Sequence, residues 1–195
     1  EGPKLVGDLL RHFPCRLLVA TAQWLAQHKQ VEAAQIVEAT DDELSRASLL
    51  KTPQQVLALF EQPTEEVNTN YPKSELCLAL DDVQDPGNFG TIIRLADWFG
   101  IRHIYCSPNT ADAFSPKVIQ ATMGAIARVN VHYTPLPDLI QSLGDTPIYG
   151  TFLDGDSIYK QSLSENGLIV MGNEGNGISQ PVAGLINRKM LIPNY

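Results

Sequence analysis

The hydrophobic residues of this chain are concentrated in short runs rich in Leu, Ile and Val, and polar stretches with glycine or proline separate the runs. Short apolar runs predict buried β-strands, while longer stretches with apolar residues at helical spacing predict helices. In the first part of the chain, strands are predicted at 15–20, 35–39 and 55–60. Helices are predicted at 5–10, from Thr21 to about residue 29, and after Thr40, where Thr-Asp-Asp-Glu matches a capping box. Residues 1–62 are therefore predicted to form a small α/β domain.

After a polar segment with prolines near both ends, residues 63–74, strand-like and helix-like stretches alternate more regularly. Strands are predicted at 76–83, 101–106, 126–132, 147–151, 168–171 and 189–192. Helices are predicted between them at 90–99, 116–123, 137–143 and 180–186. This order predicts an α/β domain over residues 75–195, with a mostly parallel sheet covered by helices on both faces. Ligands of such sheets bind beyond the carboxyl ends of the strands.

The composition indicates an ordered chain with buried thiols. Of the 195 residues, 44% are hydrophobic, which excludes a disordered chain, and no apolar run approaches the roughly 18 residues of a membrane span. Cys15, Cys77 and Cys106 lie in strand-like runs without C-x-x-C spacing, which predicts reduced thiols in a cytoplasmic protein. The histidines show no metal-ligand spacing, so they are predicted to serve in the core or on the surface. Trp24 and Trp98 lie on predicted helices, where they are expected to pack.

The charge argues against a simple nucleic-acid binder, including a binder of duplex DNA. Lys and Arg number 14 and Asp and Glu number 22, giving a net charge of −8, whereas a strong duplex binder is usually basic. Residues 94–128 differ from the rest, because basic side chains outnumber acidic ones there. The basic residues of this stretch are Arg94, Arg102, Lys117 and Arg128. They allow a local basic face on an acidic protein.

The chain between the first strand and the first helix of the second domain has turn and capping chemistry. Asp85-Pro86-Gly87 predicts a tight turn, and Asn88 is predicted to cap the helix by accepting the N–H of Thr91. Arg94 lies one turn further on, outside the predicted apolar face, which comprises Ile92, Leu95, Ala96 and Phe99. Two interpretations remain open. The segment is a capped surface helix with an exposed arginine, or its start and Arg94 bind an anion such as phosphate.

A second unusual loop, residues 171–179, follows the strand predicted at 168–171 and contains three glycines within six residues. Glycines allow a close approach of the backbone to a ligand. The order G-x-x-G-x-G differs from the dinucleotide fingerprint G-x-G-x-x-G, and no lysine follows as in a P-loop. Glu174 within the glycines would repel a phosphate and suits a cationic ligand or one with hydroxyl groups. The alternative is a tight turn whose glutamate merely faces water.

The two loops together resemble a known family. Asp82-x-x-Asp85-Pro86-x-Asn88-x-Gly90-x-x-x-Arg94-x-Ala96 is similar to the first signature of the SpoU (TrmH-like) branch of the SPOUT RNA methyltransferases. Gly172-x-Glu174-x-x-Gly177-Ile178-Ser179 is similar to the second. Residues 1–70 resemble the small N-terminal extension of the family, which binds RNA and has a ribosomal-protein-like α/β fold.

The resemblance implies S-adenosylmethionine as methyl donor, a trefoil-knotted domain, and a homodimer with its sites at the interface. It implies methyl transfer to a ribose 2′-hydroxyl of tRNA or rRNA, without a metal. The implied catalytic residues are Asn88, Arg94 and Glu174. The implied donor-binding residues are Thr151, Gly172, Gly177 and Ile192. A guanidinium stays protonated, so we expect Arg94 to hold a phosphate beside the target ribose rather than to act as a base.

One family feature is missing from the sequence. The third signature, a Ser-Leu-Asn segment and the helix after it, is expected after Ile192-Pro193, but the sequence stops at Tyr195 and lacks a starting Met. The methyltransferase domain is therefore expected to be C-terminally incomplete, without the segment that closes the knot, and to be part of a longer protein. Two other functions remain open: a non-catalytic RNA-binding module of the same fold, and an α/β enzyme for another adenine-containing cofactor. Binding of S-adenosylmethionine separates both from the methyltransferase.

Overall fold

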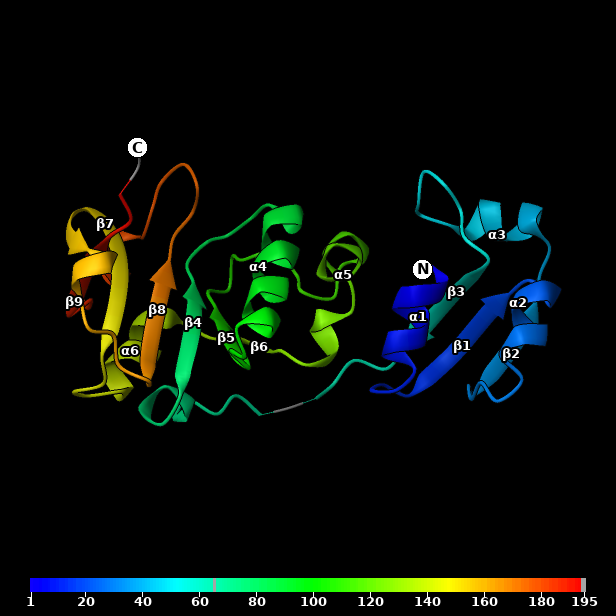
Figure 1. The fold of residues 1–195 in the computed structure, drawn as a ribbon, viewed down its shortest axis with the longest axis horizontal. Coiled ribbons are helices and arrows are strands. Elements are labelled where there is room, and N and C mark those ends of the chain that lie inside the picture. Colours follow the sequence, from blue (N-terminus) through cyan, green and yellow to red (C-terminus); the bar gives the residue numbers. More distant parts are fainter. Residues whose placement is uncertain (65, 194–195) are drawn as a thin grey trace.

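In a computed structural model, which describes residues 1–64 and 66–193, the chain forms two β-sheets that lie side by side and are joined by an extended segment (Figure 1). Glu65 of the predicted linker and the last two residues of the predicted second domain, Asn194 and Tyr195, lie outside the described residues. The strands of the first sheet fall within residues 15–60 and those of the second within residues 76–191.

The first sheet is small and has the strand order β2-β1-β3, with β1 parallel to β2 and antiparallel to β3. Its strands, β1 (Cys15–Ala20), β2 (Gln35–Glu38) and β3 (Val56–Phe60), agree with the predicted runs. Its helices are α1 (Pro3–Leu9), α2 (Ala22–Gln27) and α3 (Asp41–Ala47). The predicted caps are confirmed, since Thr21 accepts the N–H of Trp24 at 3.2 Å and Thr40 forms a capping box with Glu43.

The second sheet has six strands in the order β6-β5-β4-β8-β7-β9, and every pairing between them is parallel. The strands are β4 (Leu76–Leu80), β5 (His103–Cys106), β6 (Asn130–Tyr133), β7 (Ile148–Ser157), β8 (Gly167–Met171) and β9 (Arg188–Leu191). The helices are α4 (Pro86–Trp98), α5 (Pro116–Thr122), α6 (Leu136–Ser142) and α7 (Gln180–Ala183). Short 3₁₀ turns are η1 (Tyr71–Lys73), η2 (Ala125–Ala127) and η3 (Ile158–Lys160). The predicted α/β fold with a mostly parallel sheet is confirmed, whereas the knot and the ribosomal-protein-like fold stay predictions.

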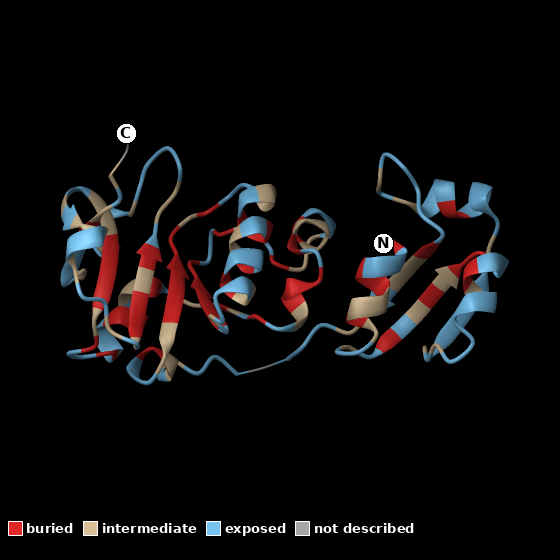
Figure 2. Ribbon diagram, viewed as in Figure 1, coloured by how far each residue is buried: buried red, intermediate tan, exposed pale blue. Residues whose placement is uncertain are grey.

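Helices cover both faces of the six-stranded sheet, and the central strands are buried between them (Figure 2). On one face, α4 and α5 pack with Phe89, Ile93 and Val118 against β4 and β5. On the other face, α6 and α7 pack with side chains such as Leu139 and Val182. Two apolar layers around one sheet account for the near-continuous hydrophobic runs of β4, β5 and β8, as expected for a buried parallel sheet.

Helix α1 connects the two sheets. Its Val6 is buried in the core of the small sheet together with Leu18. Its Leu5 and Leu9 belong instead to the core formed by α4, α5 and the large sheet, which includes Val118. Because one short helix contributes to both cores, the orientation of the small domain is fixed partly by α1 packing.

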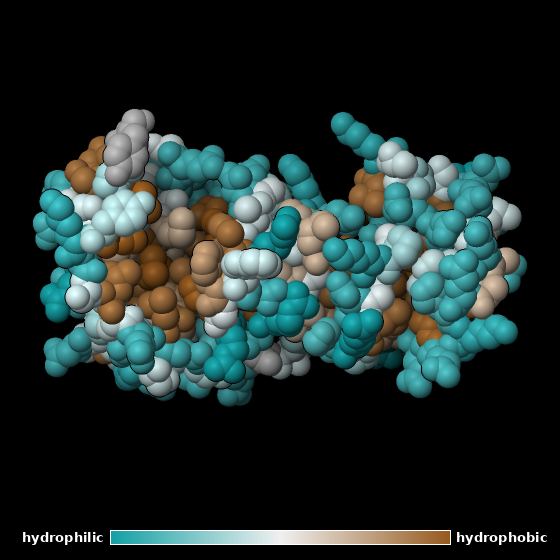
Figure 3. All heavy atoms as spheres, viewed as in Figure 1, coloured by the Kyte–Doolittle hydropathy of each residue, from teal (hydrophilic) through white to brown (hydrophobic). Residues whose placement is uncertain are grey.

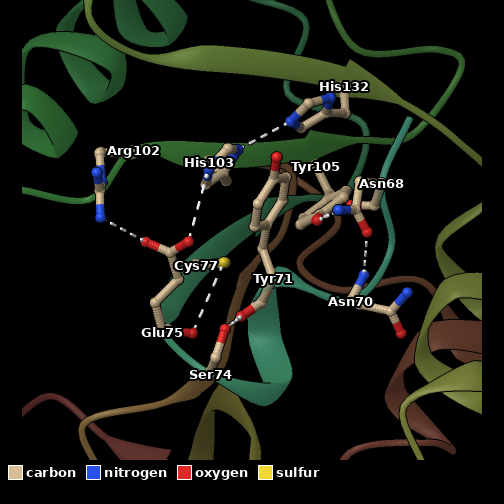
Figure 4. Close-up of polar contacts among 10 residues, drawn as sticks. All are labelled: Asn68, Asn70, Tyr71, Ser74, Glu75, Cys77, Arg102, His103, Tyr105 and His132. Atoms are coloured by element: carbon tan, nitrogen blue, oxygen red, sulfur yellow. Dashed lines mark hydrogen bonds and ion pairs between the residues drawn. The ribbon is translucent and has the colours of Figure 1, made fainter. Parts of the chain in front are cut away.

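The end of the predicted linker also packs on the large sheet (Figure 4). Tyr71 stacks on the ring of His103, with centroids 3.6 Å apart, and the hydroxyl of Tyr105 donates a hydrogen bond to the carbonyl of Asn68. His103 Nδ1 lies 3.1 Å from Nε2 of His132, and both rings are buried. Because Tyr71 stacks on His103 and Asn68 accepts a hydrogen bond from Tyr105, residues 68–75 pack against the sheet.

The exposed side of α4 differs from the prediction. The structure buries Phe89, Gly90, Ile93 and Ala96 and leaves Leu95 50%, Phe99 73% and Trp98 84% exposed. The predicted apolar face is therefore confirmed for Ala96 and for Ile92, which packs against the core, but it was wrong for Leu95 and Phe99. The predicted packing of Trp98 was also wrong. Most of the circumference of α4 is apolar, and the close crossing with α5 selects the side that faces the core. A Cβ on Gly90 would lie 2.4 Å from Cβ of Ala121, so glycine is needed there.

The strand predicted at 126–132 begins later than expected. Residues 125–127 form η2, and β6 starts only at Asn130. Helix α5 ends with Met123 and Gly124 in left-handed conformations, at φ of 53° and 93°, so the chain turns before it can extend. The three cysteines are free and buried as predicted, and burial raises the pKa of Cys77 to about 12. No helix within residues 1–64 and 66–193 is long and apolar enough to cross a bilayer.

Candidate active site

The start of α4 lies at the carboxyl end of β4, where the first predicted site loop was placed. Asp85 is the N-cap of α4, and its side chain accepts the N–H of Asn88 at 2.7 Å. The prediction that Asn88 itself caps the helix was therefore wrong. Pro86 occupies the first turn, so the helix begins at residue 86 instead of the predicted residue 90. Asn88 thus lies inside the helix, and its side chain is released from capping.

The second loop, residues 171–179, lies beside the first because β4 and β8 are neighbouring parallel strands. The strand order reverses at this pair, since β5 and β6 follow β4 on one side of it and β7 and β9 lie on the other side, while all strands stay parallel. Parallel sheets bind ligands at such a switch point, beyond the carboxyl ends of the strands. The fold therefore brings the two predicted loops to the edge where a ligand site is expected.

Two side chains tie these loops together. Asn173 donates from Nδ2 to the carbonyl of Asp82 at 2.9 Å, while its Oδ1 accepts the N–H groups of Gly175 and Asn176. The buried carboxylate of Asp81 accepts the N–H of Ser179 at 2.7 Å. The sequence motifs assigned a site role to neither Asp81 nor Asn173. An acidic residue at the end of a buried strand was the available signal for Asp81.

The glycines of the second loop have different roles. A Cβ on Gly172 would lie 2.1 Å from the carbonyl carbon of Gly177, so residue 172 must be glycine for the loop to close on itself. Gly177 has a φ of +69°, which favours glycine, and its N–H donates to the carbonyl of Asn173 at 2.8 Å. Gly175 has no such restriction, because its nearest neighbour would lie 3.5 Å from a Cβ.

The structure brings two predicted catalytic residues into contact. Asn88 of α4 donates a hydrogen bond from Nδ2 to Oε1 of Glu174 in the second loop. Both side chains are exposed, so the contact lies at the surface of the sheet edge rather than in the core. The donated bond leaves Oδ1 of Asn88 and the second carboxylate oxygen of Glu174 as hydrogen-bond acceptors at the site.

Arg94 is exposed, as predicted, but its side chain leaves the helix in a different direction from that of Asn88. Six residues separate it from Asn88, which places the two side chains about 120° apart around the helix. Among the described residues, Arg94 has no hydrogen-bond or ion-pair partner. Trp98, the most exposed aromatic residue of α4, lies about 40° from it around the helix. Within a single chain the Arg94 side chain therefore lies on the uncovered side of α4, about 120° around the helix from Asn88.

The predicted donor-binding residues lie along the same edge of the sheet. Thr151 is in β7, Gly172 directly follows β8, and Ile192 directly follows β9. Thr151 pairs with Met190 and its neighbour Gly150 with Val170, so the three residues come from adjacent parallel strands. These positions therefore follow one another across neighbouring strands at the carboxyl edge, where the loop with Gly177 also lies.

The basic face allowed by residues 94–128 is only partly present. Arg128 forms a two-pronged ion pair with Asp97, 2.6 Å at its shortest, which raises the pKa of Arg128. Arg102 pairs with Glu75 at 3.5 Å near the opposite edge of the sheet (Figure 4). Arg94 and Lys117 are left as unpaired cations of that stretch among the described residues. No group of His, Cys, Asp or Glu in the described part of the chain is arranged to hold a metal ion.

We expect Asn173→Ala to loosen the second loop. The change removes three hydrogen bonds that join this loop to itself and to Asp82, so the free energy of unfolding should fall by about 1–3 kcal/mol. Amide hydrogen exchange of residues 171–179 should increase in parallel. Asn176→Ala in the same loop is the control, since the Asn176 side chain is exposed. Equal exchange in both variants would contradict the role of Asn173.

The arrangement presents groups of opposite charge on two neighbouring segments. It combines an exposed carboxylate and amide, a loop whose backbone approaches closely, and an unpaired guanidinium on the adjoining helix face. A carboxylate in the glycine loop disfavours a nucleoside triphosphate, and it favours a ligand with a positive charge or hydroxyl groups. A cationic or hydroxyl-bearing ligand at the carboxylate, with an anionic group at the guanidinium, fits this arrangement best.

Comparison with known proteins confirms the family that the two loops resemble. The model of the SpoU rRNA Methylase family matches residues 75–195. The chain is 31% identical over 159 residues to the 23S rRNA (guanosine(2553)-2′-O)-methyltransferase RlmP of Bacillus subtilis, and the alignment covers 80% of this chain and 62% of that enzyme. The chain thus spans less than two thirds of the length of this relative.

Solved structures match the whole of this chain. A protein of the TrmH family from Porphyromonas gingivalis superposes with a TM-score of 0.86 at 43% identity, covering 100% of this chain and 79% of that one. An rRNA methyltransferase from Sinorhizobium meliloti with bound AdoMet superposes with a TM-score of 0.83 at 29% identity, covering 100% and 77%.

Proposed function

The chain belongs to the SpoU rRNA methylase family, and from this premise we propose that it transfers a methyl group from S-adenosylmethionine to a ribose 2′-hydroxyl of RNA. The observation that carries the proposal is the Asn88–Glu174 hydrogen bond, which joins the two signature loops at the carboxyl edge of β4 and β8. The relatives support an RNA substrate, because the Bacillus subtilis protein is named a 23S rRNA 2′-O-methyltransferase. We propose rRNA or tRNA as the substrate class.

The residues at this edge fit an adenosyl donor. Gly172 allows its loop to fold back onto Gly177 without a Cβ collision, and Thr151 and Ile192 bring backbone groups from the neighbouring strands. We propose that these four residues hold the donor, largely through backbone atoms. When bound, S-adenosylmethionine supplies an electrophilic methyl group on a sulfonium. The exposed Glu174 carboxylate gives the opening a negative charge, which favours a cationic donor.

The catalytic residues of the proposal position the ribose. Asn88, oriented by Glu174, offers its free Oδ1 as an acceptor for a sugar hydroxyl. Arg94 holds an adjacent phosphate, because a guanidinium binds phosphate oxygens in a two-pronged geometry and keeps its proton. Since transfer of a methyl group in line needs alignment more than acid or base strength, fixed side chains and excluded water supply most of the rate.

We further propose a homodimer in which the uncovered side of α4 is buried. Leu95, Trp98 and Phe99 form an exposed apolar stripe on this helix, and apolar side chains gather over the neighbouring β4 and β8 (Figure 3). Contiguous exposed apolar surface usually marks an interaction site. Arg94 lies about 40° from Trp98 around the helix, so a second copy on the stripe would bring Arg94 to the interface. The buried, reduced thiols favour the cytoplasm as its location.

We expect Trp98→Asp to shift the protein toward monomers. A charge in the middle of the stripe would have to be desolvated in a dimer, and interface tryptophans commonly contribute 2 kcal/mol or more, so the dimer dissociation constant should rise by about 30-fold or more. Sedimentation velocity over a range of concentrations measures the change. Leu49→Asp places the same charge at another exposed apolar residue, 74% exposed in the small domain, and should leave the assembly unchanged.

Methyl transfer itself is tested with tritiated S-adenosylmethionine and separate 23S rRNA, 16S rRNA and tRNA transcripts. Label is expected in one RNA class, in dinucleotides that resist alkaline cleavage, because cleavage requires a free 2′-hydroxyl. Label in the base, or no transfer despite donor binding, would contradict ribose methylation. RNA binding without any affinity for the donor, measured by calorimetry, would favour a non-catalytic RNA-binding module.

A further inference from the structure

A polar groove of about 1010 Å³ lies on the small domain, between α1 and the segment from α2 to Glu32. It differs from the larger cleft of about 1050 Å³ between the small sheet and α5, which is lined mostly by apolar side chains and has Lys117 as its cation. The polar groove contains half of the Lys and Arg residues of the small domain. These are Lys4, Arg11 and Lys29.

The cations of this groove are available to a ligand. Among the described residues, Lys4, Arg11 and Lys29 form neither ion pairs nor side-chain hydrogen bonds, and all three are exposed. By contrast, Arg16 of the same domain pairs with Glu61 at 2.5 Å. Unpaired basic side chains on a chain of net charge −8 form a local positive region, which favours a polyanion.

The acidic side chains of the groove do not cancel this charge. Asp8 is turned toward the large domain, because a Cβ placed on Gly124 would lie only 3.1 Å from its Oδ2. Its charge acts on Arg128, which is also paired with Asp97. Glu32 is then the one acidic side chain left to face three cations in the described lining.

One aromatic ring of the groove is held in a fixed position and remains accessible. His28 stacks on the buried indole of Trp24, with ring centroids 3.9 Å apart and an angle of 9° between the planes. His28 Nδ1 lies 2.8 Å from the carbonyl of Trp24, which fixes Nδ1–H as a donor. His28 is nevertheless exposed, so the ring presents its outer side to solvent. A flat ring held above a buried indole is suited to stack a nucleobase.

Helix α1 links this groove to the candidate active site. Lys4 and Arg11 lie on its outer side, whereas its Leu5 and Leu9 are packed into the core that contains Phe89 of α4. A polyanion held in the groove would therefore be held at a fixed position relative to α4. Enzymes use contacts remote from the reacting atoms in this way to position large substrates.

We propose that the groove between α1 and α2 binds a single-stranded or looped segment of the RNA substrate, with Lys4, Arg11 and Lys29 on its phosphates and His28 stacked on a base. This inference rests on the proposed function, which supplies RNA as the substrate. The groove would thus add RNA contacts on the small domain to the phosphate contact of Arg94 on the large domain. Unpaired bases fit it better than a duplex, because a duplex hides the faces that His28 would stack on.

The test uses the purified chain and a fluorescein-labelled oligouridylate of about 12 nucleotides, with a duplex of the same length for comparison. The triple variant Lys4→Gln, Arg11→Gln, Lys29→Gln should bind the single strand about tenfold more weakly. Its plot of log affinity against log salt should be shallower by about 2, because each lost phosphate contact on a single strand removes about 0.7. The matched control carries the same changes at the other three basic positions of the small domain, Arg16, Arg46 and Lys51.

Substitutions of His28 test the stacking separately. His28→Ala should weaken binding of the oligouridylate about tenfold, whereas His28→Phe, which keeps a flat ring, should bind nearly as well as the wild type. Unchanged affinity in the triple variant, equal losses in the control, or preference for the duplex would overturn the groove as the binding surface while leaving methyl transfer intact. A wild-type chain that binds S-adenosylmethionine but neither methylates nor binds any RNA would overturn the proposed function together with this inference.

Discussion

Arg94→Ala is expected to lower methyl transfer by about 10²–10³-fold while S-adenosylmethionine still binds with wild-type affinity, because removal of one preorganised charged contact typically costs this much. Arg94 is exposed and has no partner among the described residues, so its loss should not disturb the fold. Single-turnover transfer of labelled methyl, with calorimetry for the donor, measures the two effects. Arg102→Ala is the control, since this exposed arginine lies near the opposite edge of the sheet. Near-wild-type turnover of Arg94→Ala would show that the assigned role is wrong.

Activity of mixed dimers shows whether Arg94 acts in the site of its own chain or in that of the second copy. In one chain the guanidinium points about 120° away from Asn88 and shares its side of α4 with Trp98, so we expect it to serve the site of the second copy. Heterodimers of an Arg94→Ala chain and a Gly172→Ala chain then contain one complete site. They should recover activity, although each parent dimer is inactive. No recovery would place Arg94 in the site of its own chain.

Gly172→Ala is expected to abolish donor binding and to lower methyl transfer by about 10²-fold or more, since displacement of a site by about 1 Å has this effect. The added Cβ would lie 2.1 Å from the carbonyl carbon of Gly177, and both atoms belong to the framework of the loop, so the backbone must open. Calorimetry with S-adenosylmethionine and circular dichroism separate a lost site from a lost fold.

Gly175→Ala is the matched control for this prediction. It adds the same methyl group three residues away, where the nearest atom, Oδ1 of Asn173, would lie at an ordinary 3.5 Å. Donor affinity of this variant should stay within about threefold of the wild type, because the alanine neither collides nor needs a positive φ. If both alanine variants bind the donor equally well, backbone closure at Gly172 is not what forms the site.

Several features of the site followed from local sequence alone. Neighbouring residues determine the helix caps at Thr21 and Thr40 and the apolar runs of the strands. The order of strands and helices could therefore be predicted, and with it the parallel sheet and the edge that carries the loops. The glycines of 171–179 and the turn at Asp85 likewise identified the two loops. The contact between Asn88 and Glu174 required α4, which follows β4, and the loop after β8 to lie side by side, as the structure displays.

Other features depended on contacts between distant segments. The side of α4 that is buried was set by the crossing of Gly90 with Ala121, and periodicity could not choose it because the helix is apolar around most of its circumference. The function of Asn173 likewise depends on Asp82, 91 residues away in the chain. The groove of α1 and α2 exists only because His28 stacks on Trp24 and Asp8 turns toward the large domain. Sequence thus determined the elements and the chemistry that they carry, since these rest on local hydrogen bonds and apolar spacing. Tertiary structure alone decided which faces are buried and which charges stay unpaired, because both depend on packing between segments remote in sequence.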